Sequence, residues 1–151
     1  MGTYVVRRRA RIDADPARVL ALIEDLRAWR EWSPWEGLDA DLERSYTEPT
    51  RGPGAAYAWS GNRRAGRGSM EITSSDPEHV HLTLTFERPF RSSSEVAFTV
   101  QPDGTGADVE WAMTGERSGL WGLLGRLVPM DALLGRDFEK GLRRLAEVAE
   151  A

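Results

Sequence analysis

The sequence has 151 residues, the usual size of one ordinary domain. It contains no cysteine, which excludes disulfide bonds, thiolate metal sites and a cysteine nucleophile. Its 20 basic and 24 acidic residues give a net charge of −4 at pH 7, so there is no general attraction to nucleic acid or to an anionic membrane.

The hydropathy pattern argues against a membrane protein. No apolar run approaches the ~18 residues of a membrane-spanning helix, and charged residues follow directly after the first few positions. We therefore expect a cytoplasmic protein that forms a single domain over residues 1–151 and does not insert stably into a membrane.

The first expected element is a β-strand from Tyr4 to Ile12, where residues alternate between two faces. Three of its four arginines share the outer face: Arg7, Arg9 and Arg11. Arg8 has the opposite parity and faces inward, so it must be paired or must serve a polar group of a ligand. The strand carries no aromatic residue between its arginines for base stacking, so we expect no nucleic-acid partner.

Two short helices are expected next. Asp15 is a suitable N-cap and Pro16 a suitable first helical residue. A second short helix or turn carries Trp29 and Trp32, which lie one helical turn apart, and Pro34 stops it.

The middle of the chain is predicted to form antiparallel strands, because apolar side chains recur at every second position between turn residues. The alternating sets are Leu38, Ala40 and Leu42; Ala55, Tyr57 and Trp59; Gly68, Met70 and Ile72; Val80, Leu82, Leu84 and Phe86; Val96, Phe98 and Val100; and Val109, Trp111 and Met113.

The rest of the chain, from Ser118, has a helical pattern with a break at Pro129. Apolar residues then follow at steps of three and four: Met130, Leu134, Phe138, Leu145 and Val148. Gly135 and Gly141 interrupt this helix, and we expect one of them to let it approach the sheet or a ligand closely. This helix is the only element long enough to cover the sheet. We therefore expect an α+β fold, in which a curved antiparallel sheet of about six to seven strands wraps around a long C-terminal helix.

Short motifs built from Gly, Pro and Trp extend over nearly the whole chain. They are Ile12-x-Ala14-x-Pro16-x-x-Val19, Trp29-x-x-Trp32-Ser33-Pro34-Trp35, Gly52-x-Gly54-x-x-Tyr57-x-Trp59-x-Gly61-Asn62, Gly66-x-Gly68-x-Met70-x-Ile72 and Gly135-x-Asp137-Phe138-Glu139-x-Gly141-Leu142. In this order they resemble the START-like helix-grip superfamily (SRPBCC), and within it the polyketide cyclase/dehydrase-like branch. The resemblance implies a deep apolar cavity between sheet and C-terminal helix. Some members bind or carry lipids, steroids or aromatic products, and a few cyclise polyketides.

The alternation predicts which side chains would line such a cavity. From the strands these are Tyr57, Trp59, Met70, Phe86, Trp111 and Met113; from the helix Met130, Leu134 and Phe138; and from the mouth Trp32 and Trp35. The same side chains could simply fill a hydrophobic core, and the three clustered tryptophans could cap its open end. The sequence leaves both interpretations open.

Possible polar groups of the cavity are Arg8, Arg44, Tyr46, Asn62 and Asp131. None forms a recognisable catalytic pair, so the sequence names no catalytic residue. His79 and His81 flank Val80 and face outward without a visible third ligand, so we expect neither a metal nor another cofactor.

These observations favour a monomer or weak homodimer that binds or transports a hydrophobic, ring-containing small molecule or lipid in an internal cavity. One alternative is a polyketide cyclase or dehydratase, in which Tyr57 or Arg44 polarises a carbonyl. The other is a chaperone-type protein-interaction module whose own side chains fill the cavity.

Overall fold

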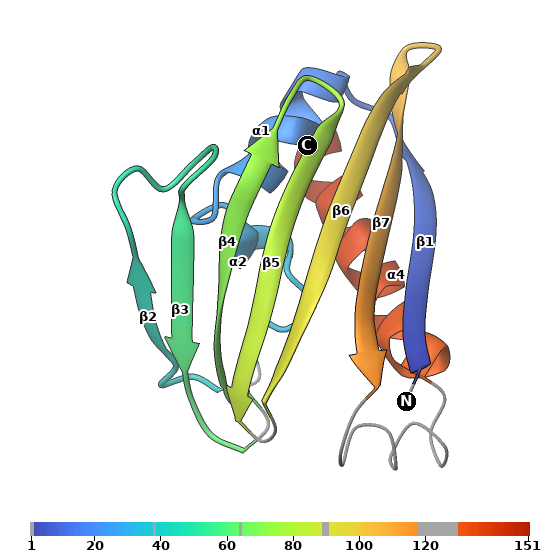
Figure 1. Ribbon diagram of the computed structural model, residues 1–151. Coiled ribbons are helices and arrows are strands. Elements are labelled where there is room, and N and C mark those ends of the chain that lie inside the picture. Colours follow the sequence, from blue (N-terminus) through green and yellow to red (C-terminus); the bar gives the residue numbers. More distant parts are fainter. Residues whose placement is uncertain (1, 38, 64, 89–90, 118–129) are drawn as a thin grey trace.

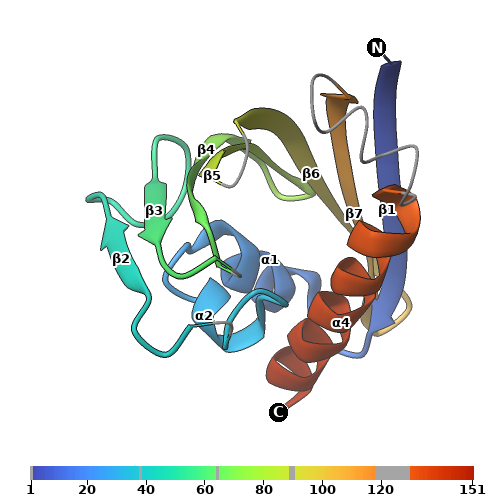
Figure 2. The ribbon, with the colours of Figure 1, turned by 90° about the horizontal axis from the view of Figure 1, so that it is seen from below.

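The computed structural model describes residues 2–37, 39–63, 65–88, 91–117 and 130–151. In this part of the chain, seven antiparallel strands form one curved sheet, and the helices lie on its concave side (Figures 1 and 2). This confirms the expected α+β helix-grip architecture.

The elements follow the predicted order. Strand β1 (Gly2–Ile12) is followed by two short helices, α1 (Pro16–Glu24) and α2 (Trp29–Trp32). The remaining strands are β2 (Glu43–Tyr46), β3 (Ala56–Ser60), β4 (Arg67–Ser75), β5 (His79–Arg88), β6 (Ser92–Asp103) and β7 (Gly106–Arg117). Helix α4 (Met130–Glu150) ends the chain.

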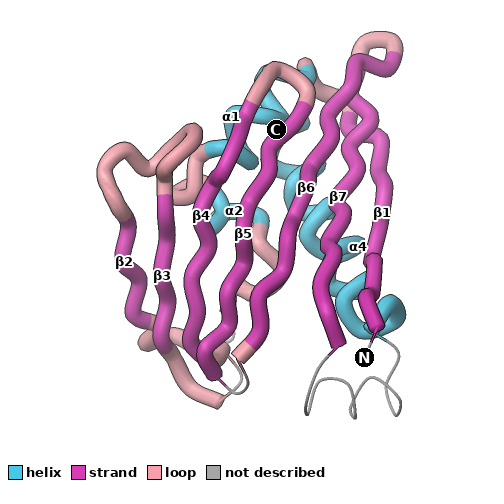
Figure 3. The backbone as a smooth tube through the Cα atoms, viewed as in Figure 1, coloured by secondary structure: helices cyan, strands magenta, loops and turns pink. Residues whose placement is uncertain are grey.

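The sheet has the order β1-β7-β6-β5-β4-β3-β2, so each strand from β2 to β7 lies beside its neighbour in sequence (Figure 3). Strand β1 joins at the far edge beside β7, with Arg8 opposite Trp111. Helix α4 packs against β1 at this edge, whereas β2 and β3 form the opposite edge.

Local sequence signals explain most element boundaries. The Asp15 side chain accepts a hydrogen bond from the backbone N–H of Ala17, as an N-cap should, and Pro16 opens α1.

The strand predicted from the Leu38, Ala40 and Leu42 alternation is wrong, because β2 begins only at Glu43. Asp39 instead holds a turn, since its carboxylate accepts the backbone N–H of Asp41 at 2.9 Å.

The C-terminal helix confirms the predicted apolar stripe. Phe138 and Leu145 are fully buried, and the Phe138 ring stacks on Trp111 with 4.2 Å between centroids and 6° between planes. The helical pattern expected for Leu120, Leu123, Leu124 and Leu127 lies outside the described residues.

Both glycines of α4 lie at close contacts. A Cβ atom on Gly141 would lie 2.8 Å from a ring carbon of Trp111 and 2.9 Å from Pro34 Cδ. A Cβ atom on Gly135 would overlap the guanidinium of Arg8. The close helix–sheet approach expected at one glycine is therefore present at both.

Two of the three outward arginines of β1, Arg9 and Arg11, pair with acids of neighbouring strands. Arg9 lies 3.3 Å from Asp108, and Arg11 lies 3.3 Å from Asp103. Most of the positive charge on this face is therefore paired. In the described ranges, no helix is long and apolar enough to cross a membrane.

Candidate functional site

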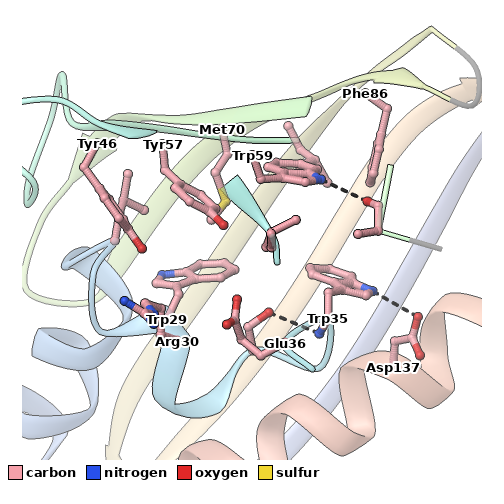
Figure 4. Close-up of a pocket in the computed structure, with 15 residues that line it drawn as sticks. Trp29, Arg30, Trp35, Glu36, Tyr46, Tyr57, Trp59, Met70, Phe86 and Asp137 are labelled. Carbon is pink, nitrogen blue, oxygen red and sulfur yellow. Dashed lines mark hydrogen bonds between the residues drawn. The ribbon is translucent and has the colours of Figure 1, made fainter. Parts of the chain in front are cut away.

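A pocket of about 320 Å³ lies between the β2–β5 half of the sheet and the segment that runs from the end of α1 to the start of β2 (Figure 4). Most of the side chains around it are aromatic or aliphatic. Its lining consists of Leu26, Trp29, Arg30, Ser33, Trp35, Glu36, Leu42, Tyr46, Tyr57, Trp59, Ala65, Met70, Leu84, Phe86 and Asp137.

A continuous row of aromatic rings forms the sheet side of the pocket. Tyr46 faces Tyr57 across the β2–β3 pair, and their rings stack at 4.9 Å. Tyr57 in turn stacks on Trp59 at 5.8 Å, and Trp59 meets Phe86 edge-on at 5.5 Å. Gly68 makes this possible, because a Cβ atom there would lie 2.7 Å from the Trp59 ring.

The indole N–H groups of the pocket are bonded to the protein itself. Trp29 Nε1 donates to the carbonyl of Ile23 at 2.8 Å, and Trp59 Nε1 donates to the carbonyl of Ala65 at 3.0 Å. Trp35 Nε1 donates to the Asp137 carboxylate of α4 at 3.1 Å. These bonds hold the rings in place and leave their apolar faces for contact with other molecules.

Polar groups gather at the β2 end of the pocket. The guanidinium of Arg44 forms an ion pair with the carboxylate of Glu36. Burial raises the pKa of Tyr57 to about 12 and also raises the pKa of Tyr46. Both phenols therefore keep their protons at neutral pH and can donate hydrogen bonds.

The family of this chain follows from a match over nearly its whole length. A family model described as polyketide cyclase / dehydrase and lipid transport matches residues 3–150. The chain belongs to this family. No curated protein matches it.

Solved structures show the same fold at low sequence identity. The KanY protein is 24% identical, with both chains covered completely and a TM-score of 0.70. Protein CV1439 from Chromobacterium violaceum is 18% identical, with 97% of each chain covered and a TM-score of 0.70. DynU16, described as a putative protein in the dynemicin biosynthetic locus, is 15% identical; the match covers 97% of this chain and 47% of DynU16, with a TM-score of 0.66.

Within this family fold, six of the side chains predicted for the cavity lie on the pocket wall. They are Trp35, Tyr57, Trp59, Met70, Phe86 and Tyr46. The sequence alternation placed the five strand residues among them on the concave side of the sheet, and the strand order brings these together at one end of it. Trp35 was predicted at the pocket mouth from its loop after Pro34 and reaches the same pocket.

Other predicted cavity residues lie elsewhere, and these placements are corrections. Trp32, Trp111 and Phe138 are fully buried in the core, where their rings pack on one another and on neighbouring aromatic side chains. Met113 lines a separate cavity of about 10 Å³, and Leu134 is a half-buried residue packed against the core.

Of the other predicted polar groups, some lie near the pocket and some lie elsewhere. Arg8 does face inward, but its Nε donates to Glu139 of α4 at 2.9 Å, away from the pocket lining. Asn62 lies exposed in the β3–β4 turn, where its side-chain oxygen accepts the N–H of Ala65. Arg44 lies beside the pocket and is paired with Glu36. The side chains of Met130 and Asp131 lie outside the described residues.

Sequence reasoning missed several pocket residues: Leu26, Trp29, Arg30, Ser33, Glu36, Leu42, Ala65, Leu84 and Asp137. Leu84 shares the parity of Phe86 and could have been found from the alternation. Most of the others belong to loops or short helices, where no periodicity indicates which way a side chain points.

The two histidines lie outside the pocket lining. His79 Nδ1 lies 3.0 Å from the Asp76 carboxylate, and His81 is exposed. Across the described residues, no group of three His, Cys, Asp or Glu side chains is placed to hold a metal ion.

Proposed function

We propose that this chain binds a hydrophobic, ring-containing small molecule in the pocket between β2–β5 and α2. The observation that carries this proposal is the open space of about 320 Å³ beside the stacked rings of Tyr46, Tyr57 and Trp59. Flat ring systems suit such a wall, because they can pack against exposed aromatic faces.

The size of the pocket supports a ligand of a few rings. Its volume of about 320 Å³ lies at the lower end of the usual range for small-molecule sites, roughly 300–1,000 Å³. It is also about twice the ~150 Å³ of an engineered cavity that accepts benzene. Compounds with two or three fused rings therefore fit better than a full-length lipid.

The family supports the same assignment at a coarser level, since its description combines polyketide cyclase, dehydrase and lipid transport. An open pocket also argues against the chaperone-type alternative, which expects the cavity to be filled by the protein's own side chains.

A cyclase or dehydratase activity is the second candidate, because two protonated phenols lie at one end of the pocket. Tyr46 and Tyr57 could donate hydrogen bonds to a carbonyl oxygen whose negative charge grows during the reaction. In the described part of the pocket, both acids are already engaged: Glu36 pairs with Arg44, and Asp137 accepts from Trp35. Carrier function therefore stands first.

A ligand panel tests the proposal. Fatty acids, steroids and flavonoids are added to purified protein, and thermal stability and tryptophan emission are recorded. A ligand at a hundredfold excess over its dissociation constant should stabilise the fold by about 2.7 kcal/mol. It should also change tryptophan emission, because three indoles line the pocket. Analysis of the recovered ligand for chemical conversion separates an enzyme from a carrier.

A matched pair of variants controls the panel. Met70→Trp places a large ring in the pocket and should abolish the ligand response while the protein stays folded. Val5→Trp adds the same ring on the exposed surface of β1 and should leave the response unchanged. The absence of both stabilisation and an emission change across the whole panel would refute the proposal. Native mass spectrometry of the same samples reads the stoichiometry and tests the expected monomer or weak homodimer.

A further inference from the structure

Arg30 and Arg44 lie at the β2 end of the pocket, and of the two only Arg44 forms an ion pair with a described residue. Arg44 is neutralised by its ion pair with Glu36. Arg30 lies on the pocket lining with an exposed side chain, and none of the described residues gives its guanidinium an ion pair or a hydrogen bond. Arg30 is therefore a solvated positive charge on the pocket lining that is free to pair with an anionic group.

The hydroxyl group of Tyr46 lies at the same end. It is buried, and among the described residues it has no hydrogen-bond partner. Figure 4 shows this hydroxyl directed inward from β2, on the same side of the pocket as Arg30. A buried hydroxyl without a partner is costly, so a ligand oxygen that accepts its hydrogen bond would bind with a clear gain.

The remaining charges around this end are also positive on balance. The guanidinium of Arg27 lies 4.4 Å from the centre of the Tyr46 ring, on a side chain that is exposed to solvent. Burial raises the pKa of Tyr46, and the nearby charges of Arg30 and Arg44 oppose that rise. Glu36 is the only acid on this part of the described lining, and Arg44 already compensates it.

We propose that the ligand carries a carboxylate, with one oxygen paired to Arg30 and the other accepting the Tyr46 hydroxyl, while its rings lie along Tyr57 and Trp59. This inference rests on the proposed function, because it assigns the head group of the same ligand. The natural ligand class is then a compact aromatic or polycyclic acid.

The donor set explains why a carboxylate fits better than other head groups. It has two oxygens, and the site offers one cationic donor and one neutral donor. A phosphate dianion would bring a second negative charge close to the Glu36 carboxylate, whereas a carboxylate brings only one. An ammonium group would meet two donors, and the only acid on this part of the described lining, Glu36, is already paired with Arg44.

The test compares two ligands of the same shape. Binding of 2-naphthoate and of its neutral isostere 2-naphthamide is measured by calorimetry at pH 7 in low salt. We expect naphthoate to bind about tenfold more tightly, the usual scale of a charge-assisted contact. The chain's net charge of −4 opposes general anion binding, so the preference has to come from the site.

Substitutions test whether Arg30 and Tyr46 cause the preference for naphthoate. Arg30→Gln should remove most of it, and Tyr46→Phe should reduce it severalfold, while both leave naphthamide binding within about twofold. Arg143→Gln serves as the matched control, because Arg143 is exposed on α4 and outside the pocket lining. It should keep the full preference for naphthoate.

The outcomes separate the two proposals. Equal binding of naphthoate and naphthamide, or equal weakening of both by Arg30→Gln, overturns the carboxylate assignment and leaves the pocket as a binder of neutral rings. If neither compound binds, and the wider ligand panel gives neither stabilisation nor a change in tryptophan emission, the proposed function fails together with this inference.

Discussion

At the level of single residues, burial keeps the tyrosines of the pocket wall neutral. The Tyr57 hydroxyl has its pKa raised to about 12, first by loss of solvent and then by the charges of Tyr46 and Glu36. Arg44 opposes this rise by its charge and by a hydrogen bond. The pocket therefore offers phenol donors over the whole physiological pH range.

This shift predicts how stability depends on pH. Tyr57 ionises near pH 10 in the unfolded chain and near 12 in the folded protein, so between these values the folded state holds the proton more tightly. The stabilisation is complete below pH 10 and is lost as the pH rises towards 12. Urea unfolding at a series of alkaline pH values should show this decline, and Tyr57→Phe should make it shallower. Some slope remains in the variant, because the pKa of Tyr4 is also raised by burial. Identical slopes for the two proteins would contradict the assignment.

At the level of elements, the close packing of α4 against the sheet depends on two glycines as well as on its apolar side chains. Gly141 lies against Trp111 and Pro34, both of which are rigid and buried. Gly135 lies against the guanidinium of Arg8, which is the mobile end of a flexible side chain. The two glycines should therefore respond differently to the same substitution.

We predict that Gly141→Ala lowers the free energy of unfolding by up to about 2 kcal/mol, because overpacking costs about 1–3 kcal/mol and the helix gains about 1 kcal/mol from alanine. Gly135→Ala is the matched comparison and should raise the free energy of unfolding by up to about 1 kcal/mol, since the helix gains from alanine while Arg8 can move aside and its ion pair is partly exposed. Chemical denaturation measures both. Equal effects at the two positions would show that the Gly141 contact has been misassigned.

Phe138 is the main apolar anchor of the same helix. Phe138→Ala should cost about 3–5 kcal/mol, because it removes a fully buried ring that stacks on Trp111. Lys140→Ala, at an exposed position on the same helix, should stay within about 0.5 kcal/mol. A loss below about 1 kcal/mol for Phe138→Ala in chemical denaturation would exclude α4 as the element that the sheet grips.

The elements themselves could be predicted because their signals are local. Period-two alternation, the Asp15–Pro16 cap and the stripe on α4 each depend on neighbours in sequence. The failure at Leu38–Leu42 is also local, since the Asp39 side chain competes for the backbone and forms a turn.

The position of the pocket could not be predicted in this way. Parity indicates which face of the sheet a side chain occupies, but not how far along the sheet it lies from α4. Tyr57 and Trp111 share the concave face, yet Tyr57 lines the pocket and Trp111 is packed beneath the helix. Only the strand order, which is set by long-range pairing, separates them.

At the level of the whole molecule, the sheet has two unequal halves. In the β1–β7–β6 half, β1 and β7 pack against α4, and β7 and β6 contribute the large buried rings of Trp111 and Phe98. The other half ends in β2, a four-residue edge strand that pairs only with β3 and borders the pocket. Local opening should therefore be easier at the pocket side.

Hydrogen exchange tests this difference. Backbone amides of β2 and β3 should exchange faster than those of β6 and β7 in the free protein, because fewer buried contacts hold the edge pair. A bound ring compound should slow exchange in β2 and β3 and leave β6 and β7 nearly unchanged. Uniform protection across the sheet, with or without ligand, would contradict this division.

The position of β1 also has a consequence for synthesis of the chain. Strand β1 emerges from the ribosome before the other described strands, but β7, its partner in the described sheet, is the last of them to follow. Until then both of its edges are open to pairing with other nascent chains. Positive charges alternate along the unpaired strand, at Arg7, Arg9 and Arg11. Charged side chains of this kind are known to protect exposed strand edges against aggregation. Pairing of Arg9 with Asp108 of β7 and of Arg11 with Asp103 of β6 then offsets two of these charges when the sheet closes.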